Sequence, residues 1–180
     1  MWLRAILRMA LAALLGSGCT STDSLVLKHP TTGAPLAHTR YVLDSVEASL
    51  RVNGVLHENK NGISVFEGVT DASGRTVAFK TEPPNKAAYV GRVVGEGPYS
   101  VRFVIRHESR DPHPGVPYVV VLHSDKVCYE GVSDENGRTA RYKSPTKGGT
   151  ATVLFMRPEY LKRENRRPKQ CEGFKFVPFF

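Results

Sequence analysis

Two histidines and two carboxylates stand close together in one short stretch of the chain, His107-Glu-Ser-Arg-Asp-Pro-His113. Imidazole and carboxylate groups at this density could ligate a metal ion, or could act as a general base with an acid partner. The spacing matches no standard zinc-ligand pattern, and Pro112 and Pro114 indicate a loop. We therefore expect a solvated linker between two β-rich regions here, without a metal site.

The sequence offers no stronger catalytic pattern. It has no Gly-x-Ser-x-Gly elbow, no phosphate-binding loop and no cysteine in the setting of a nucleophile. Its three cysteines show neither a Cys-x-x-Cys pair nor a Cys/His spacing typical of zinc. We therefore predict a protein that is not an enzyme and that holds no cofactor.

Cys19 ends a segment with the order of a secretory signal peptide. Arg4 and Arg8 form a positive segment before the short apolar run Met9–Leu15, and Gly-Ser-Gly follows that run before Cys19. The run is far shorter than the roughly 20 residues that span a bilayer. The segment Leu15-Gly-Ser-Gly-Cys19 resembles the bacterial lipobox, in which the cysteine is diacylated before cleavage, although its leucine stands one place further from the cysteine than usual.

This resemblance implies a signal peptide over residues 1–18 and a lipidated tether over 19–37, with Cys19 as the lipid site. Thr20 is not the aspartate that commonly retains lipoproteins in the inner membrane, so the periplasmic side of the outer membrane is expected. The inner membrane and the soluble periplasm are the alternatives. Ordinary cleavage near the same site, which would leave Cys19 unmodified, also stays open.

The chain carries a formal net charge of +8, and removal of Arg4 and Arg8 would leave 8 − 2 = +6. Nucleic acid is a poor partner for an exported protein. An acidic protein, an anionic lipid or peptidoglycan fits this charge and location better. A well-solvated surface would explain the same charge.

If Cys19 is acylated, Cys128 and Cys171 remain as an even pair in an oxidising compartment. We expect a disulfide between them. It would close a loop of about 44 residues and would stabilise the fold by roughly 3–4 kcal/mol on the loop-entropy estimate.

From about Thr39 onward, apolar and polar residues alternate with period two in short runs that Gly, Pro, Asn and Asp interrupt. This pattern predicts an all-β antiparallel β-sandwich of about nine to eleven short strands. One short C-terminal helix is expected over Pro158–Arg167, where Glu159 suits the first turn and Arg166 and Arg167 suit the last. A closing strand is expected over residues 173–180, pinned by Cys171 to the strand that holds Cys128.

An internal repeat is the most specific feature. The stretch 66–76, Phe-Glu-Gly-Val-Thr-Asp-Ala-Ser-Gly-Arg-Thr, returns at 129–139 as Tyr-Glu-Gly-Val-Ser-Asp-Glu-Asn-Gly-Arg-Thr. If the first copy carries a 14-residue insertion, Pro35 and Tyr41 align with Pro112 and Tyr118. We therefore expect two related hairpin repeats, over residues 38–110 and 111–180.

Each repeat holds an Asp-x-x-Gly turn. Asp71 and Asp134 stand where a carboxylate can accept backbone N–H groups, and Gly74 and Gly137 stand where φ must be positive. We assign these four residues to the turns. Arg75 and Arg138 follow directly; we expect each to pack its stem on the hairpin and to pair with the turn aspartate.

These residues resemble the transthyretin (prealbumin-like, or carboxypeptidase-regulatory-like) β-sandwich family, in which a G-x-T-D-x-x-G-x-T hairpin follows a strand bearing proline and tyrosine. The resemblance covers roughly residues 33–156. It implies a fold more than a function, and similar modules occur in bacterial type VI secretion spike proteins and their toxins. The catalytic hydroxyisourate hydrolases of this superfamily end in Tyr-Arg-Gly-Ser, whereas this chain ends in Val-Pro-Phe-Phe.

Taken together, these features favour a membrane-anchored, periplasm-facing, protein-binding lipoprotein. An immunity protein that neutralises a type VI effector is the expected role, and a structural or scaffolding lipoprotein of the envelope is the alternative. We expect partner contacts in the insertion, about Asp44–Gly62, and in the basic segment 157–169. The candidate residues are His57, Glu58, Arg157, Lys162, Arg163, Arg166 and Arg167. A disordered loop and a surface helix without a binding role are the alternatives.

Overall fold

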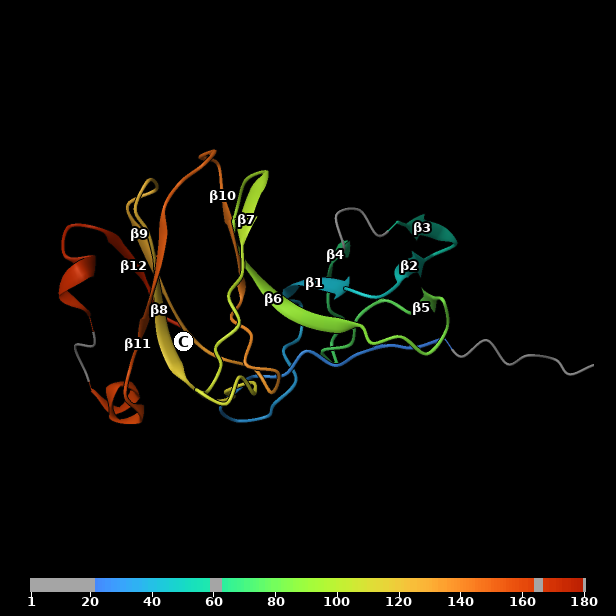
Figure 1. Ribbon diagram of the computed structural model, residues 1–180, viewed down its shortest axis with the longest axis horizontal. Coiled ribbons are helices and arrows are strands. Elements are labelled where there is room, and N and C mark those ends of the chain that lie inside the picture. The colour runs from blue at the N-terminus through green and yellow to red at the C-terminus, as the bar shows by residue number, and fades with distance from the viewer. Residues whose placement is uncertain (1–21, 59–62, 164–166, 180) are drawn as a thin grey trace, which may run out of the picture.

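A computed structural model describes residues 22–58, 63–163 and 167–179, which form two β-sheet halves placed side by side (Figure 1). These residues contain β-strands and two short 3-10 helices, so the all-β prediction is confirmed. Over the same ranges, no helix is long and apolar enough to cross a membrane. The strands are β1 (Arg40–Ser45), β2 (Ser49–Val52), β3 (Val55–His57), β4 (Ser64–Val69), β5 (Phe79–Glu82), β6 (Tyr89–Gly95), β7 (Tyr99–Val101), β8 (Pro117–Leu122), β9 (Val127–Val132), β10 (Arg141–Ser144), β11 (Ala151–Phe155) and β12 (Lys175–Val177).

The strands form three sheets, ordered β4-β1-β6-β10-β7, β11-β8-β9-β12 and β3-β2-β5. The five-stranded sheet runs through both halves, because β10 of the second repeat pairs with β6 of the first. Its β4-β1-β6 part packs against β3-β2-β5, and its β10-β7 part packs against the four-stranded sheet. Two small sandwiches therefore share one continuous sheet. Most pairs are antiparallel, but β6–β10 and β9–β12 are parallel.

The sequence repeat is a structural repeat, built around one buried tyrosine in each half. The hydroxyl of Tyr41 accepts the N–H of Val77 at 3.0 Å, and that of Tyr118 accepts the N–H of Ala140 at 3.0 Å. Each ring lies against a glycine of the next strand, Gly68 or Gly131, where a Cβ atom would come within 2.7 or 2.4 Å of the ring or its hydroxyl. The conserved spacing of the two copies thus places equivalent groups in equivalent contacts.

The expected tether over 19–37 is wrong for its second part. Leu27 is 6% exposed, its N–H donates to the carbonyl of Gly74 at 2.9 Å, and Asp23 pairs with Phe79. The second repeat starts in the same way, since the N–H of Ile105 donates to the carbonyl of Gly137 at 2.7 Å. Each repeat therefore begins about ten residues before its proline. This segment donates a hydrogen bond to the turn carbonyl and contributes a buried side chain, Leu27 or Ile105, to the core. Residues 1–21, including Cys19, lie outside the described ranges.

The loop His107–His113 therefore does not link the two repeats, because the second repeat begins before it. The loop is a turn inside the second repeat, closed by hydrogen bonds from His107 N to Asp111 O and from His113 N to Ile105 O, each 2.9 Å. The expected boundary at residue 110 would cut this turn in two. The two imidazole rings stack at 3.6 Å.

The insertion of the first repeat is part of the core and is more than a binding loop. Its strand β2 pairs with β5, and Leu50 and Val52 are at most 1% exposed in the core with Leu43 and Phe79. The burial of these two apolar side chains stabilises the sheet by roughly 1.5–3 kcal/mol each. Within the range Asp44–Gly62, the exposed residues are Val46, Glu47 and those around β3, and 59–62 lie outside the described residues.

The C-terminal helix is shorter than expected. Its place is taken by two 3-10 helices, η1 (Pro158–Lys162) and η2 (Lys169–Cys171). The charged stretch after Tyr160 lacks the apolar stripe that holds a longer helix against a core. The closing strand is confirmed as β12, which pairs parallel to β9, the strand of Cys128. This segment covers the outer face of β8, so that all six residues of β8 are buried.

Candidate functional site

The four turn residues have the structural role that the sequence predicts. Asp71 Oδ1 accepts the N–H groups of Ser73 and Arg75 at 2.8 and 2.9 Å, and Asp134 Oδ1 accepts those of Asn136 and Arg138 at 2.9 and 2.8 Å. Gly74 and Gly137 have φ of +75° and +67°. The backbone N–H of Arg75 lowers the pKa of Asp71, whereas burial raises the pKa of Asp134.

The arginines after the turns make contacts other than the expected ones. Arg75 donates to Ser24 Oγ at 3.3 Å, and Arg138 donates to Asp44 Oδ1 at 3.3 Å while its guanidinium lies 3.5 Å from the ring centre of Tyr89. Each side chain thus bonds to an acceptor in a neighbouring segment, while its backbone N–H bonds to the turn aspartate. In the second repeat that acceptor belongs to the first repeat.

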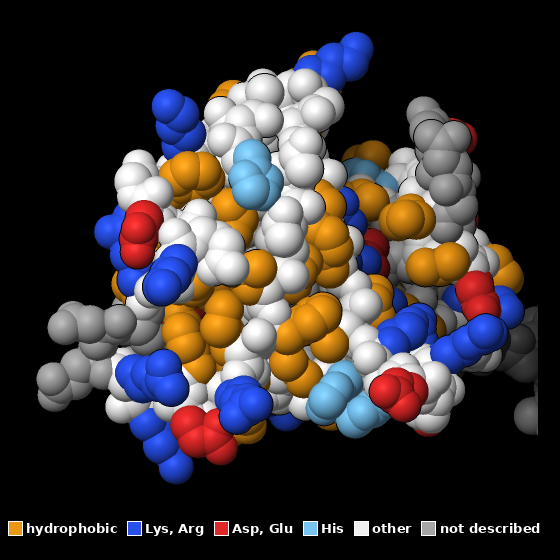
Figure 2. Space-filling model, turned by 60° about the vertical axis from the view of Figure 1, so that its left-hand side comes forward, with side chains coloured by type: hydrophobic (Ala, Val, Ile, Leu, Met, Phe, Trp, Pro, Cys, Tyr) orange, Lys and Arg blue, Asp and Glu red, His pale blue; other side chains and the backbone are white. Residues whose placement is uncertain are grey.

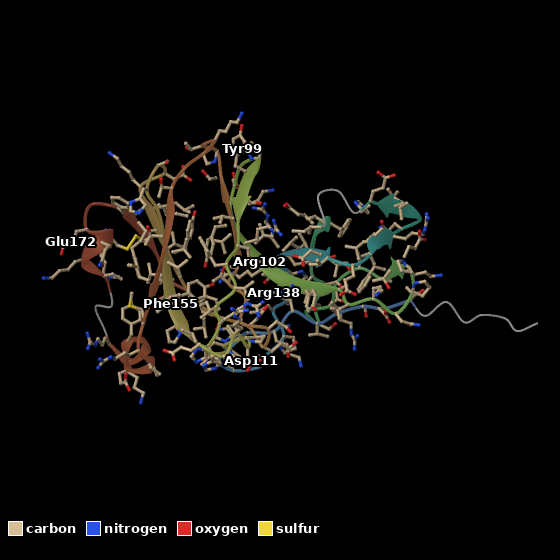
Figure 3. The ribbon with its side chains drawn as sticks, in the orientation of Figure 1. Tyr99, Arg102, Asp111, Arg138, Phe155 and Glu172 are labelled. Carbon is tan, nitrogen blue, oxygen red and sulfur yellow. A yellow bond between two sulfur atoms is a disulfide. The ribbon has the colours of Figure 1, made fainter. Side chains whose placement is uncertain are left out.

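Asp44 is the centre of an ionic joint between the repeats, formed with Arg102, Arg138 and Arg141. Nitrogen–oxygen distances are 2.5, 3.3 and 3.5 Å, and Asp44 has no exposed side-chain surface. Arg102 and Arg138 lie where the two halves meet (Figure 3). Burial, followed by the charge of Arg102, lowers the pKa of both Arg138 and Arg141. Sequence reasoning placed Asp44 in a binding loop and did not find this joint.

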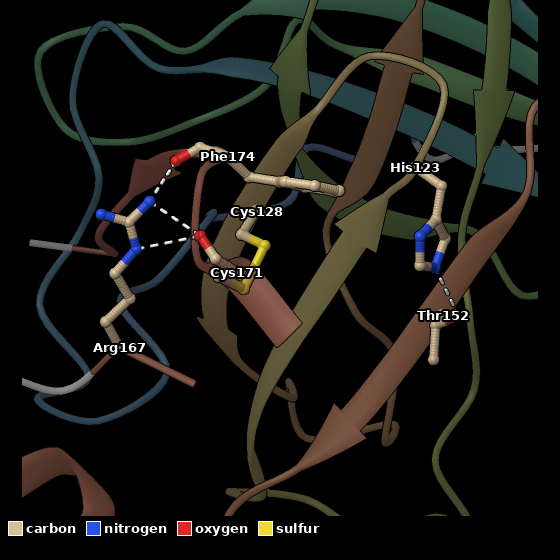
Figure 4. The surroundings of a disulfide bond; sticks show 6 residues. All are labelled: His123, Cys128, Thr152, Arg167, Cys171 and Phe174. Atoms are coloured by element: carbon tan, nitrogen blue, oxygen red, sulfur yellow. Dashed lines mark hydrogen bonds between the residues drawn. A yellow bond between two sulfur atoms is a disulfide. The ribbon is translucent and has the colours of Figure 1, made fainter. Parts of the chain in front are cut away.

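A disulfide joins Cys128 and Cys171, as the cysteine count predicts, with the two Cα atoms 6.0 Å apart. Both residues have no exposed surface. The guanidinium of Arg167 donates to the carbonyls of Cys171 and Phe174 and thereby closes the turn before β12 (Figure 4). The predicted contact residue Arg167 is therefore engaged within the C-terminal segment.

The other predicted contact residues fall at two separate places. Arg157, Lys162 and Arg163 are exposed around η1 in the second repeat, and Arg166 lies outside the described residues. His57 and Glu58 belong to the first repeat, where the His57 ring packs 5.2 Å from that of Phe66. On the face of the second repeat in Figure 2, basic side chains are scattered around a group of apolar ones. The predicted residues thus do not form one site.

An apolar sheet edge in the first repeat was missed. Strand β4 is the outermost strand of the five-stranded sheet, and β3 lies beside it at the edge of the three-stranded sheet. We call the exposed side chains there the apolar edge. They are 37–60% exposed and comprise Val55, Leu56, Ile63, Val65 and Val69.

The repeat shows why this edge is unusual. By the alignment of the two copies, Val65 and Val69 of β4 correspond to Cys128 and Val132 of β9. These residues of β9 are 0% and 6% exposed, whereas those of β4 are 37% and 60% exposed. The difference follows from β12 and η2, which cover β9. The sequence carries no signal for this edge, because both copies hold apolar residues at these positions and only their burial differs.

Among residues 22–58, 63–163 and 167–179, no group of three or more His, Cys, Asp and Glu side chains is placed to hold a metal ion. Comparison of the chain with protein-family models, with curated proteins and with solved structures yields no match.

Proposed function

We propose that the chain is a periplasm-facing lipoprotein, anchored through Cys19, that binds another protein. The partner proposed is an effector of a type VI secretion system, which the chain neutralises as an immunity protein. The observation that carries protein binding is the apolar edge along β3 and β4. The resemblance of the two Asp-x-x-Gly-Arg-Thr hairpins to secretion-associated modules supports this choice of partner.

An open sheet edge presents N–H and C=O groups that can pair with a further strand. Proteins usually protect such an edge with lysine, proline or a bulge, whereas β4 exposes valines at 65 and 69. Its charged residue Glu67 is held by Lys143, whose Nζ lies 2.9 Å from the carboxylate. In the same chain, the matching edge of β9 is occupied by β12. An extended segment of a partner that adds to β4 would give the first repeat the cover that the second already has.

The exposed basic residues around η1 lie far from this edge, beside the four-stranded sheet at the opposite end of the molecule (Figure 1). They would act on encounter with an acidic partner through long-range attraction, which changes association rates more than affinity. Arg157, Lys162 and Arg163 therefore support the proposal as steering residues, and the edge supports it as the contact.

The test uses the effector encoded beside the gene for this chain. Cells that make this effector in the periplasm should grow only when the chain is also exported, and the two purified proteins should form a complex. Val55→Lys and Val69→Lys each place a charge on the edge, at side chains that are 60% exposed and tolerate it. We expect at least about tenfold weaker binding, since hot-spot changes at interfaces cost ~1.4 kcal/mol or more.

Val104→Lys is the matched control, because Val104 is 44% exposed but lies outside the edge. Its binding and rescue should equal those of the unaltered chain. Rescue that persists in both edge variants, or no complex with the effector, would contradict the proposal.

A scaffolding lipoprotein of a secretion or cell-wall assembly is the second candidate. It is favoured by the continuous sheet, whose open end at β4 could be extended by a strand of a neighbouring subunit. In that case the chain would bind an assembly component through the same edge, and the effector would remain toxic in its presence.

A further inference from the structure

A cavity of about 240 Å³ lies at one end of the second sandwich. Its walls come from β7 and β10 on one side and from the ends of β8 and β11 on the other. The loop 145–150, which carries the chain from β10 to β11, closes the top, and Tyr99 stands near it at the tip of β7 (Figure 3). The volume is below the roughly 300–1,000 Å³ of sites for drug-sized ligands. One ring-sized molecule would fill it.

The apolar part of the cavity wall belongs to the core of the second repeat. Tyr142 and Leu122 are 1% and 6% exposed, and Val101 and Ala151 pack on the same core. The Tyr142 hydroxyl is occupied by a 2.9 Å hydrogen bond to Tyr118. These residues are held by packing on both sheets, so the cavity is a formed feature of the fold. They offer apolar contact to one face of a ligand.

The rest of the wall is rich in hydroxyl groups. Ser100, Ser124, Ser144, Thr146 and Thr150 contribute them, next to the carboxylate of Asp125. The Thr146 hydroxyl donates to Asp125 at 2.8 Å, and the Ser144 hydroxyl accepts the N–H of Thr146 at 2.9 Å. These bonds fix the loop and leave acceptor and donor capacity, since a carboxylate accepts about four bonds and a hydroxyl can both donate and accept.

The charge of the wall is opposite to that of the chain. The chain has a net charge of +8, but the lining contains one carboxylate and neither lysine nor arginine. Arg141 touches the rim only by donating to Ser100 Oγ at 3.2 Å. A phosphate or a carboxylate in this cavity would face Asp125, and no lysine or arginine lines the wall to pair with it. A neutral ligand with several hydroxyl groups matches the wall, since each polar group would find a partner.

At the corresponding end of the first repeat, the polar side chains bond to the backbone of that repeat. There, the Ser45 hydroxyl donates to the carbonyl of Ala87 at 2.8 Å, and Thr81 Oγ1 accepts the N–H of Lys86 at 3.3 Å. Ser45 and Ala48 are buried. The fold thus can close this end, and the second repeat instead surrounds an open volume with hydroxyl groups.

We propose that this cavity binds a single neutral pyranose ring of a saccharide. One face of the ring packs against the apolar wall and Tyr99, which is 39% exposed, and the ring hydroxyls bond to Asp125 and the serine and threonine hydroxyls. This site is separate from the apolar edge of the first repeat. It does not depend on the protein-binding role.

The experiment is a titration of the isotope-labelled chain with methyl glycosides of glucose, galactose and N-acetylglucosamine, followed by amide chemical shifts. We expect a dissociation constant on the order of 1 mM for at least one of them, as suits a ligand of this size. The shifts should gather at Tyr99, Ser124 and Thr150. Methyl glucuronide has the glucose ring with a carboxylate added, and it should bind more weakly than methyl glucoside.

Two variants locate the site. Tyr99→Ala should weaken binding roughly fivefold or more through lost ring contact, and Asp125→Ala at least about tenfold through lost charged hydrogen bonds. Phe155→Ala removes an aromatic residue that is 65% exposed and distant from the cavity, and it should bind normally. No shift with any of the three neutral glycosides, tighter binding of the glucuronide, or unchanged affinity in both cavity variants would overturn the proposal.

Discussion

The carboxylate of Asp44 in the first repeat is bound by Arg102 of the second, at 2.5 Å, and has no exposed surface. By the alignment of the repeats, the position of Asp44 corresponds to Val121, which is also fully buried. Arginines of the second repeat cover the outer face of β1, and the C-terminal segment covers the outer face of β8. The outer face of the first repeat is therefore covered by the second repeat, and the equivalent face of the second repeat is covered by the C-terminal segment.

Asp44→Asn should destabilise the chain by about 3–5 kcal/mol, because it leaves three mostly buried arginines without their carboxylate. Urea denaturation, followed by far-UV circular dichroism, would measure this loss. Glu47→Gln is the control, since Glu47 pairs with Lys86 at an exposed site, where such pairs contribute about 0–1 kcal/mol. Equal effects of the two variants would show that the joint is not held by Asp44.

Gly131→Ala should cost more stability than Gly91→Ala. A Cβ atom at Gly131 would lie 2.4 Å from the ring and hydroxyl of Tyr118, whereas one at Gly91 would meet its nearest neighbour at 3.8 Å. Overpacking of a rigid core costs about 1–3 kcal/mol, and we expect a loss in this range for Gly131→Ala alone. Thermal unfolding of both variants, which share a buried strand position, checks the difference.

Burial raises the pKa of Tyr118 to about 12 and that of Tyr142 well above its ordinary value. Above about pH 10 the unfolded chain would release phenolic protons that the folded chain keeps. The unfolding free energy should therefore be constant below pH 10 from this cause and should fall as the pH rises from 10 toward 12. Each tyrosine contributes up to ~1.4 kcal/mol per pH unit in this window.

Urea denaturation at a series of alkaline pH values measures this slope. Tyr142→Phe removes one of the two groups and should make the slope shallower. A slope that Tyr142→Phe does not alter would contradict the assignment.

The alternating strands and the Asp-x-x-Gly turns follow from the sequence because local chemistry determines them. The disulfide follows because Cys128 and Cys171 are the two cysteines that remain once Cys19 is set aside. The segment from Asp23 to Leu36 did not, since its few apolar residues stand among polar ones and its partner, Gly74, is distant in sequence. The Asp44 joint was also out of reach. A lone aspartate in an alternating strand shows nothing of the three arginines, which come from 58 to 97 residues further along the chain.

The lipid anchor makes a separate prediction at Cys19. Mass spectrometry of membrane-extracted protein should find a diacylglyceryl thioether on Cys19 and a disulfide between Cys128 and Cys171. Cys19→Ser should release the chain into the soluble periplasmic fraction, because a lipid anchor is then missing. A chain that fractionates with the membrane in spite of this change, or that carries an unmodified Cys19, would contradict the anchor.

Removal of the disulfide should both destabilise the fold and create a second open edge. Cys128→Ser with Cys171→Ser loses a crosslink over 43 residues, which is worth about 4 kcal/mol on the loop-entropy estimate. β12 pairs with β9 through only three residues, so we expect it to detach more often once η2 is untied. Amide hydrogen exchange should then rise at Glu130, whose backbone faces β12 in this parallel pairing, with little change at Leu43 in the first repeat.

Arg167→Ala is the matched control, because it removes the bonds to the carbonyls of Cys171 and Phe174 but keeps the crosslink. It should raise exchange in β9 less than the double variant does. A detached β12 would give β9 the exposure that β4 has, so the double variant should also self-associate more at equal concentration. Unchanged exchange in β9 would mean that packing of Phe176 alone holds β12, and the disulfide would then act only on the unfolded chain.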